Sequence, residues 1–548
     1  MTRFFSLLLM GMAFAACDSK ERADLLLYNG KMYTVDSDFS TVEAMAIHNG
    51  RIVALGNSRE LKARYRFNRS EDLKQQFVYP GFNDAHCHFV YYGLNLQQAN
   101  LLGCDSWHEV IYRLLAFAQN QPEGWLIGRG WDQNRWPDAA YPDRALLDSL
   151  FPNRPVLLRR VDGHAVIANA LALEAAGINK TTAISGGEIL RRADGSLTGV
   201  LIDNAADLAR KAEPATTAAG WRAAIQDAQS ACFAVGLTAV HDAGLSRLQL
   251  EVLRQMEAEG ELEMRVYGMI SAHPEELKYF LSQAPYKGER LHIRSFKFYA
   301  DGALGSRGAR LKEAYHDRHD HFGLWVTEPE TLAYYAPLLA AAAYQMNTHC
   351  IGDAANQQVP QIYRDVVGHQ PDHRWRIEHA QVVSPVDLAI YRDAGIVPSV
   401  QPTHATSDMY WAEERLGPER IAHAYAYQQL LQLNGWLPLG TDFPVEDISP
   451  LKTFYAAVFR TDSSGFPQGG FQFANALTRE QALRGMTIWA ARAAFEEQER
   501  GSFELGKKAD LVVMDTDLML ANPAQIQNAR LMKTMVEGKQ VYPISQAK

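Results

Sequence analysis

The histidine pair His86 and His88 is the first group in this sequence of 548 residues whose type and spacing could perform chemistry. In an extended strand, residues i and i+2 point to the same face, so both imidazoles can reach one metal ion. The motif is weak alone, because a second copy, His319-Asp320-His321, lies in a run of charged residues. The first copy differs, since it follows an apolar segment that Pro80-Gly81 interrupts. We therefore expect a metal site at the first copy and a solvated loop at the second.

Several apolar runs farther along the sequence end abruptly in polar residues. These ends are Asp301, His349, His379, Gln401 and Asp442. Amphipathic stretches separate the runs, and this alternation of strands and helices predicts βα units around a parallel sheet. The carboxyl ends of such strands meet at one mouth of an α/β fold of the TIM-like (β/α)8 barrel type. Imidazoles together with a carboxylate suit a divalent ion such as zinc.

Both ends of the sequence carry short apolar runs joined by tight turns. Asn29-Gly30 and Asn49-Gly50 lie between such runs, and these residue types tolerate the positive φ of a hairpin turn. The C-terminal segment has the same pattern, and neither end is large enough to fold alone. We expect residues 24–79 and 500–548 to form one discontinuous small β-sandwich domain, with the barrel over 80–499.

The segment from about residue 91 to 214 is too long for a single loop between a strand and a helix. It contains an aromatic-rich piece, Trp125 to Trp136, and a hairpin-like piece that turns at Asp194-Gly195. Loops at the carboxyl ends of barrel strands surround the functional mouth. We therefore expect this segment to be an insertion over the barrel mouth.

The first residues of the sequence differ from the rest. Arg3 precedes the apolar run 4–14, and the small residues Ala15-Ala16 follow it. A cationic start, a short apolar core and small residues are typical of a secretory signal, and the run is too short to span a bilayer. We expect residues 1–16 to be a signal peptide.

Cys17 directly follows these small residues and resembles the cysteine of a bacterial lipobox, although Phe14 stands where that pattern usually has Leu. We expect lipidation of Cys17, with a plain signal peptide cleaved nearby as the alternative. Asp18 resembles an inner-membrane retention signal. The resemblance implies a periplasmic protein that contacts the membrane only through a lipid anchor at Cys17.

The charge distribution excludes one class of partner. The formal net charge is -9, and no Lys/Arg-rich block occurs that could bind nucleic acid. The expected partner is a small-molecule substrate, and the sequence leaves a homodimer open. The four cysteines after Cys17 are scattered, which favours buried thiols over a disulfide framework.

One segment resembles the opening metal motif of the amidohydrolase superfamily, Pro80-Gly-Phe-Asn-Asp-Ala-His-Cys-His88. Later segments resemble the amidohydrolase-3 (YtcJ-like) branch. They are Lys297-Phe-Tyr-Ala-Asp-Gly-Ala-Leu-Gly-Ser-Arg307, Thr348-His-Cys-Ile-Gly-Asp353, Arg376-Ile-Glu-His-Ala-Gln381, Gly440-Thr-Asp-Phe-Pro444 and Gly506-Lys-Lys-Ala-Asp-Leu-Val-Val-Met514. The resemblance extends from about residue 24 to 543, is specific for the branch and says little about the substrate.

The resemblance implies a ligand set. His86 and His88 would hold the more buried metal, and His349 and His379 would hold a second. Lys297 would bridge both ions as a carbamate; the alternative is a lysine paired with an acid, Asp301 or Glu378. Whether one or two ions bind stays open.

Asp442 would contact the metal and act as general base and acid, because a carboxylate beside an acidified water can accept its proton and later deliver it. The resemblance also implies that His164 lies near the substrate carbonyl, with a structural histidine of the insertion as the alternative. Four further residues would line the substrate pocket, with packing or surface roles as the alternative: Arg129, Trp131, Arg307 and Gln401.

The complete set of ligands and a base predicts a metal-dependent hydrolase. It would cleave a non-peptide carbon–nitrogen bond, in an amide, cyclic amide or N-formyl-type substrate, by attack of a metal-bound hydroxide. Two alternatives stay open: an esterase, lactonase or phosphoesterase at the same site, because a metal hydroxide attacks those centres too, and a non-catalytic metal-binding or sensory periplasmic lipoprotein.

Overall fold

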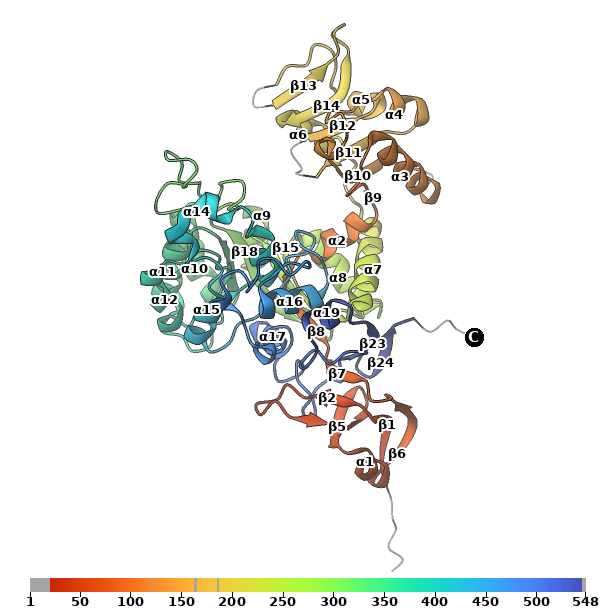
Figure 1. Ribbon diagram of the computed structural model, residues 1–548, viewed down its shortest axis with the longest axis vertical. Helices are drawn as coiled ribbons and strands as arrows, with labels where there is room; N and C mark the ends of the chain where they lie inside the picture. Colours follow the sequence, from red (N-terminus) through yellow and green to blue (C-terminus); the bar gives the residue numbers. More distant parts are fainter. Residues whose placement is uncertain (1–19, 122, 162–164, 185–186, 545–548) are drawn as a thin grey trace, which may run out of the picture.

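The computed structural model describes residues 20–121, 123–161, 165–184 and 187–544. The expected signal peptide with Cys17, and His164, lie outside the described residues. The molecule has three parts along its long axis: a small β domain at one end, a barrel in the middle and an inserted domain at the other end (Figure 1). No helix among the described residues is long and apolar enough to cross a membrane.

The barrel consists of parallel strands in the spatial order β21-β20-β19-β18-β16-β15-β8. Their bounds are β8 (Phe82–Cys87), β15 (Leu237–Leu245), β16 (Arg265–Ser271), β18 (Leu291–Tyr299), β19 (Gln345–Cys350), β20 (Arg376–His379) and β21 (Val397–Ser399). The short β17 (Tyr286–Lys287) pairs with β18 at the edge. β8 and β20 are buried along their whole length, as expected for strands covered on both faces.

The eighth position of the barrel is filled by the irregular segment 437–442 instead of a regular strand. Leu439 forms a parallel bridge with Val400 after β21, and its carbonyl accepts a hydrogen bond from Ala85 of β8. The segment therefore closes the barrel between its first and last strands. The predicted barrel class is confirmed, with this one departure from eight regular strands.

Helices follow the strands and surround the barrel (Figure 1). They are α2 (Phe89–Leu96), α7 (Ala218–Ala234), α8 (Arg247–Ala258), α9 (Pro274–Phe280), α10 (Pro329–Ala341), α11 (Ala355–Val367), α12 (Leu388–Asp393), α13 (Pro402–Asp408), α14 (Ala412–Ile421), α15 (Tyr427–Asn434), α16 (Pro450–Phe459), α17 (Arg479–Gly485), α18 (Ile488–Ala493) and α19 (Pro523–Gln527). Several begin with a polar cap, for example Ser246, whose side chain forms a capping box with Gln249 at the start of α8.

The β domain combines both ends of the chain in two sheets. One sheet contains β1 (Glu21–Tyr28), β4 (Ala44–His48), β5 (Arg51–Gly56) and β6 (Tyr65–Asp72), with α1 (Ser58–Arg64) beside it. The other has the order β24-β23-β22-β7-β2-β3, from β2 (Lys31–Tyr33), β3 (Thr41–Val42), β7 (Phe77–Pro80), β22 (Leu511–Met514), β23 (Leu531–Val536) and β24 (Lys539–Tyr542). Leu27, Ile47, Leu511 and Met535 belong to one apolar core between the two sheets, which makes the unit a sandwich.

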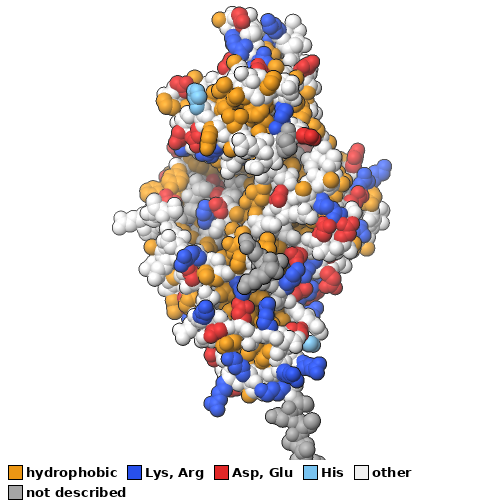
Figure 2. Space-filling model, turned by 90° about the vertical axis from the view of Figure 1, so that its right-hand side faces the viewer, with side chains coloured by type: hydrophobic (Ala, Val, Ile, Leu, Met, Phe, Trp, Pro, Cys, Tyr) orange, Lys and Arg blue, Asp and Glu red, His pale blue; other side chains and the backbone are white. Residues whose placement is uncertain are grey.

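The inserted domain follows β8 and α2, so it lies beyond the carboxyl end of the first barrel strand (Figure 1). Its sheet has the order β13-β14-β12-β11-β10-β9 and its own apolar clusters. The elements are β9 (Ala99–Asn100), α3 (Trp107–Asn120), β10 (Leu126–Trp131), α4 (Ala145–Leu150), β11 (Val156–Arg160), β12 (Ala165–Ala168), α5 (Ala170–Ala175), β13 (Gly187–Arg191), β14 (Leu197–Asp203) and α6 (Asn204–Lys211). In the space-filling view the domain forms a separate lobe above the barrel (Figure 2).

Candidate metal centre

A close backbone approach between β8 and the closing segment places Asp442 beside the two histidines of β8. A Cβ atom on Gly440 would lie 2.5 Å from the backbone nitrogen of His86, so only glycine allows this contact. Asp84 accepts hydrogen bonds from the Thr441 backbone and hydroxyl, and the Asp442 nitrogen donates to the His86 carbonyl at 2.7 Å. The Gly-Thr-Asp sequence thus ties the carboxylate to the first strand.

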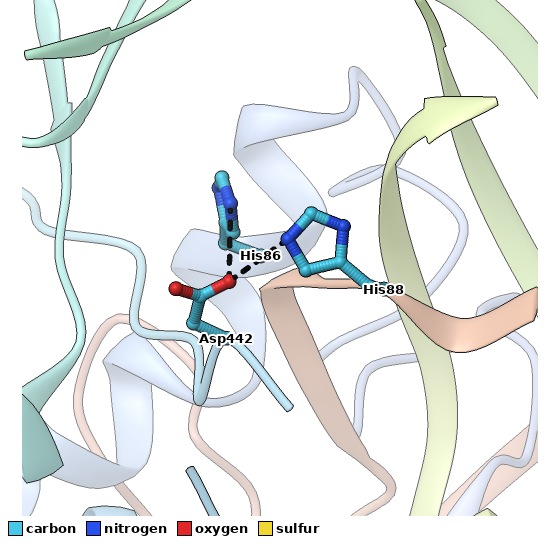
Figure 3. A group of neighbouring side chains, drawn as sticks. All are labelled: His86, His88 and Asp442. Atoms are coloured by element: carbon cyan, nitrogen blue, oxygen red, sulfur yellow. Dashed lines mark ion pairs between the residues drawn. The ribbon is translucent and has the colours of Figure 1, made fainter. Parts of the chain in front are cut away.

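The hydrogen bonds of His86 and His88 determine which nitrogen of each ring faces the site. His86 Nδ1 donates to Glu378 Oε2 at 2.6 Å, and His88 Nδ1 donates to the Ala243 carbonyl at 3.0 Å. Because these partners can only accept, each Nδ1 carries a proton, and in the neutral ring each Nε2 then presents a lone pair. Both Nε2 atoms face Asp442 Oδ1, at 3.6 Å for His86 and 3.1 Å for His88 (Figure 3).

This arrangement fits a divalent cation. Two imidazole lone pairs and a carboxylate oxygen converge on one point, and their ligand atoms lie within 4.8 Å of one another. Without a positive charge between them, these acceptors would repel one another, whereas imidazole nitrogen and carboxylate oxygen are the ligands that zinc prefers. Asp442 is also held with a positive φ of 63°, an unusual backbone conformation for a residue other than glycine and one that clusters at functional sites.

The electrostatics keep Asp442 ionised. Burial alone would raise the pKa of this carboxyl, but the imidazoles of His88, His86 and His379 around it hold the pKa well below its ordinary value. An ionised carboxylate is the form that can bind a cation or accept a proton.

Glu378 and Arg376 form a fully buried support behind His86. The Arg376 guanidinium donates to the Ala493 carbonyl at 2.6 Å and to His241 Nδ1 at 3.0 Å, and its Nη1 lies 3.8 Å from Glu378 Oε1. Burial would raise the pKa of Glu378, but His86 and then Arg376 lower it. The ionised Glu378 therefore fixes both the ring orientation and the tautomer of His86.

A second group of side chains lies on the other side of Asp442. His379 Nδ1 donates to Gln401 Oε1 at 2.7 Å, so the Nε2 of His379 also presents a lone pair. His379 has a positive φ of 72° at the end of β20, and its ring lies 4.5 Å from that of His349. His349 Nε2 lies 3.5 Å from the Gly302 carbonyl, and burial lowers its pKa to about 3.

Lys297 lies on β18 and is 1 % exposed. Its Nζ donates to His86 Nε2 at 3.0 Å, in front of the imidazole lone pair. Burial lowers the pKa of this amine, while Glu378 and Asp442 oppose the effect. The structure thus brings Lys297, His86, His88, His379 and Asp442 into one cluster at the barrel mouth.

The residues expected to line the substrate pocket lie in varied places. Gln401 orients His379 through the hydrogen bond to Nδ1. Arg307 forms an ion pair with Asp317 at 2.7 Å in the loop after β18. Trp131 is in the core of the inserted domain, where its Nε1 donates to the Leu158 carbonyl, and Arg129 is exposed on the same domain.

Sequence reasoning missed His404, which belongs to α13 and lies beside His379 and Asp442. Glu378 was expected only as an alternative partner of Lys297. A signal for His404 was available, because Gln401-Pro402-Thr403-His404 directly follows the seventh barrel strand. Proline at the first turn marks the start of a helix whose first residues lie at the barrel mouth.

Comparison with known proteins agrees with this geometry. The sequence matches the Amidohydrolase family over residues 69–542. It is 34% identical to Protein LONG AFTER FAR-RED 3 of Arabidopsis thaliana over 95% of this chain and 92% of that protein. It is 30% identical to YtcJ of Bacillus subtilis (strain 168), whose name marks it as an amidohydrolase, over 94% and 98% of the two chains.

Two further proteins bear on the chemistry. An N-substituted formamide deformylase from Arthrobacter pascens is 26% identical over 94% of this chain and 97% of that enzyme. The crystal structure of a metal-dependent hydrolase from Pyrococcus horikoshii OT3 superposes with a TM-score of 0.77 at 28% identity, over 91% of this chain and 99% of that one. The barrel, the histidine–aspartate cluster and these matches together show that the chain belongs to the amidohydrolase family.

Proposed function

We propose that this protein hydrolyses a non-peptide carbon–nitrogen bond in a metal-dependent reaction. The observation that carries the proposal is the convergence of the Nε2 lone pairs of His86 and His88 on the Asp442 carboxylate. A cation among these buried acceptors would bind their lone pairs and offset the cost of their removal from water.

The residues that would hold the ion are His86, His88 and Asp442, and zinc suits this set of ligands. A bound divalent ion would acidify a water molecule and polarise the substrate carbonyl. No nucleophilic serine or cysteine is then needed. Cys87 and Cys350 lie next to candidate ligands but are fully buried, and burial raises the pKa of both thiols, which keeps them unreactive.

Asp442 is the proposed proton carrier. Its Oδ1 faces the two histidines of β8, and its carboxylate stays ionised in this surrounding. The ionised form can accept a proton from water as the new carbon–oxygen bond forms. The same proton can then pass to the leaving nitrogen as the carbon–nitrogen bond breaks.

We further propose that Lys297 carries a carbamate. The neutral amine would add to carbon dioxide, lose one proton and gain an anionic carboxylate on its nitrogen. The burial of Lys297 among histidines supports this, because an ammonium there would repel a cation whereas a carbamate would attract it.

The proposed substrates are amides, cyclic amides and N-formyl amines. The similarity to an N-substituted formamide deformylase favours the last class, since that enzyme's name describes removal of a formyl group from nitrogen. Fold similarity alone does not decide the substrate.

The test is a panel of N-formyl amines, N-acyl amines, hydantoin-like rings and matched esters, assayed with metal-free and zinc-reconstituted protein. We expect turnover of at least one carbon–nitrogen substrate that depends on added zinc. Turnover by metal-free protein would overturn the mechanism, and turnover of the esters alone would overturn the bond class. His319→Ala, in the exposed second copy of the histidine motif, is the matched control and should behave as the unchanged protein.

A further inference from the structure

A small cavity lies behind the segment 437–442 that closes the barrel. Residues of β8, of this closing segment and of α16 line it, and Phe82, Leu439 and Met486 are part of its apolar wall. Every residue of the lining is buried. The centre of a water molecule can occupy about 10 Å³ there. That is room for a water molecule and far less than the roughly 300 Å³ of a small-molecule site.

Two residues of the lining have buried polar atoms without a partner. Asn83 of β8 is 2 % exposed, and among the described residues neither its Oδ1 nor its Nδ2 has a hydrogen-bond partner. Thr453 of α16 is equally buried, and within the described ranges its Oγ1 has no partner either. A buried polar atom that forms no hydrogen bond costs stability. Two such residues at one cavity therefore indicate a ligand that hydrogen-bonds to both.

The types of these atoms determine the chemistry of the ligand. The Asn83 amide offers both donors and an acceptor, and the Thr453 hydroxyl can donate or accept. A metal cation could bind the two oxygens but would leave the amide nitrogen unpaired. An anion would lie beside the carboxyl group of Asp84, which also lines the cavity. A water molecule donates and accepts, and buried waters typically form about three hydrogen bonds to otherwise unpaired groups.

The cavity adjoins the backbone that carries Asp442. Gly440 and Thr441 belong to its lining, and the Thr441 hydroxyl donates to Asp84 Oδ2 at 2.6 Å. The closing segment is not a regular strand, so a continuous ladder of hydrogen bonds does not fix its place in the barrel. Its position therefore depends on individual contacts with β8 on one side and with the helix behind it.

We propose that the cavity binds an internal water molecule that links the Asn83 amide of β8 to the Thr453 hydroxyl of α16. The water joins the first barrel strand to the helix across the back of the closing segment. Thr453 is then a positioning residue, which acts through the water on the backbone that carries Asp442. The water site depends only on the cavity and its polar atoms, whereas any effect on turnover rests on the proposed function.

The first test is a crystal structure of the unchanged full chain at a resolution that shows ordered water. We expect a solvent peak in the cavity, about 2.5–3.2 Å from Thr453 Oγ1 and from an amide atom of Asn83. Thr453→Val keeps the shape of the side chain without its hydroxyl and should lose the peak, whereas Thr453→Ser keeps the hydroxyl and should retain it. A cavity without a peak in the unchanged protein would overturn the proposal, and so would an unmoved peak in Thr453→Val.

Unfolding in urea distinguishes a bridge from two independent contacts. Thr453→Val and Asn83→Leu each break the bridge, so the midpoint of the double variant should fall by less than the sum of the two single shifts. Thr453→Ser leaves the hydroxyl in place, and its shift should add to that of Asn83→Leu. Additive shifts for the valine pair would contradict a bridge, as would equal coupling in the serine pair. If Asn83→Leu does not fold, the crystal structures of the two Thr453 variants decide.

The positioning role is tested by Co²⁺ titrated into metal-free protein and followed by visible absorption. Thr453→Val should weaken the affinity by up to about 10-fold, the lower end of the effect of groups that orient a metal ligand. Thr453→Ser should restore it. Thr534→Val is the matched control, because this buried hydroxyl donates to the Phe233 carbonyl at 2.7 Å, away from the cavity. It should lower the unfolding midpoint and leave the Co²⁺ affinity unchanged.

Equal Co²⁺ affinities of Thr453→Val and Thr534→Val would overturn the positioning role. The substrate panel separates this inference from the proposed function. A water peak and a weakened Co²⁺ affinity in Thr453→Val, found for a protein that hydrolyses no substrate of the panel, would overturn the function and support the water site. Zinc-dependent turnover in a protein without the water peak would do the opposite.

Discussion

Buried charges lie at both ends of the barrel, but the groups that each charge contacts differ. At the floor, where the β domain packs, Arg265 at the start of β16 donates to Asp510 at 2.6 Å and to Glu537 at 2.8 Å. Glu537 also pairs with Arg290 at 2.8 Å. Each of these charges has a partner of opposite sign. At the mouth, three imidazole lone pairs and the nitrogen of His404 face one carboxylate, with Lys297 beside His86.

The buried charges of the floor hold the β domain and the barrel together, whereas those of the mouth form the candidate site. Both clusters are buried and bear the cost of removal from water. At the floor arginine–carboxylate pairs offset this cost, whereas the Asp442 carboxylate at the mouth faces imidazole nitrogens. The mouth lacks enough positive charge for its acceptors, and a cation would supply it. Four predictions test this difference, from the largest expected effect to the smallest.

Asp442→Asn should abolish most turnover while leaving the fold intact. The change keeps the shape of the side chain but removes the proton acceptor, a role worth about 10²–10⁴-fold in rate. Steady-state kinetics on the substrate found with the panel would measure kcat. Asp510→Asn at the floor is the matched control, and a variant of Asp442 as active as that control would remove Asp442 from the mechanism.

Arg265→Met should destabilise the protein without changing the chemistry of the mouth. It leaves Asp510 buried without its partner, which costs about 3–5 kcal/mol. The urea midpoint should fall, and kcat of the folded fraction should stay the same. Arg364→Met removes an exposed ion pair on α11, where a loss below about 1 kcal/mol is expected. Equal midpoints for the two variants would contradict a structural role of the floor.

Glu378→Gln should weaken metal binding about 10–100-fold, because a neutral amide no longer fixes the proton on His86 Nδ1. Co²⁺ affinity measured by titration checks this, and the unfolding midpoint of the metal-free protein provides a separate readout of structural damage. Glu419→Gln, on an exposed part of α14, is the control. Unchanged affinity would show that Glu378 does not position His86.

The Asp510–Arg265 pair of the floor should contribute to the pH dependence of stability at acid pH. Burial would raise the pKa of Asp510, but Arg265 lowers it below its ordinary value. A lowered folded-state pKa means that the ionised carboxylate adds stability above the unfolded-state pKa of about 3.9. This contribution to stability is lost as the pH falls through the lower folded-state pKa of Asp510. The difference in unfolding midpoint between the unchanged protein and Asp510→Asn should therefore shrink below about pH 4. A difference that stays constant with pH would contradict a stabilising role of the ionised Asp510 carboxylate.

The sequence predicted the barrel class because its apolar runs end in polar residues, a pattern that indicates buried parallel strands with polar side chains at their carboxyl ends. A strand buried on both faces must be apolar, and side chains that follow such strands meet at one edge of the sheet. The two-residue spacing of His86 and His88 is likewise enough to place both imidazoles on one face of a strand. The sequence predicted an insertion because residues 91–214 are too long for one loop, and a shared β domain because neither chain end is large enough to fold alone.

The sequence by itself thus determined which residue types gather at the mouth. Only the tertiary structure decided what each one does there. The tautomers of His86, His88 and His379 depend on three partners elsewhere in the barrel, namely Glu378 of β20, the Ala243 carbonyl of β15 and Gln401 at the start of α13. Likewise, His404 meets Asp442 only because α13 turns over the barrel mouth. Periodicity reports the face of one strand or helix, whereas hydrogen bonds between strands far apart in the sequence fix the direction of each lone pair.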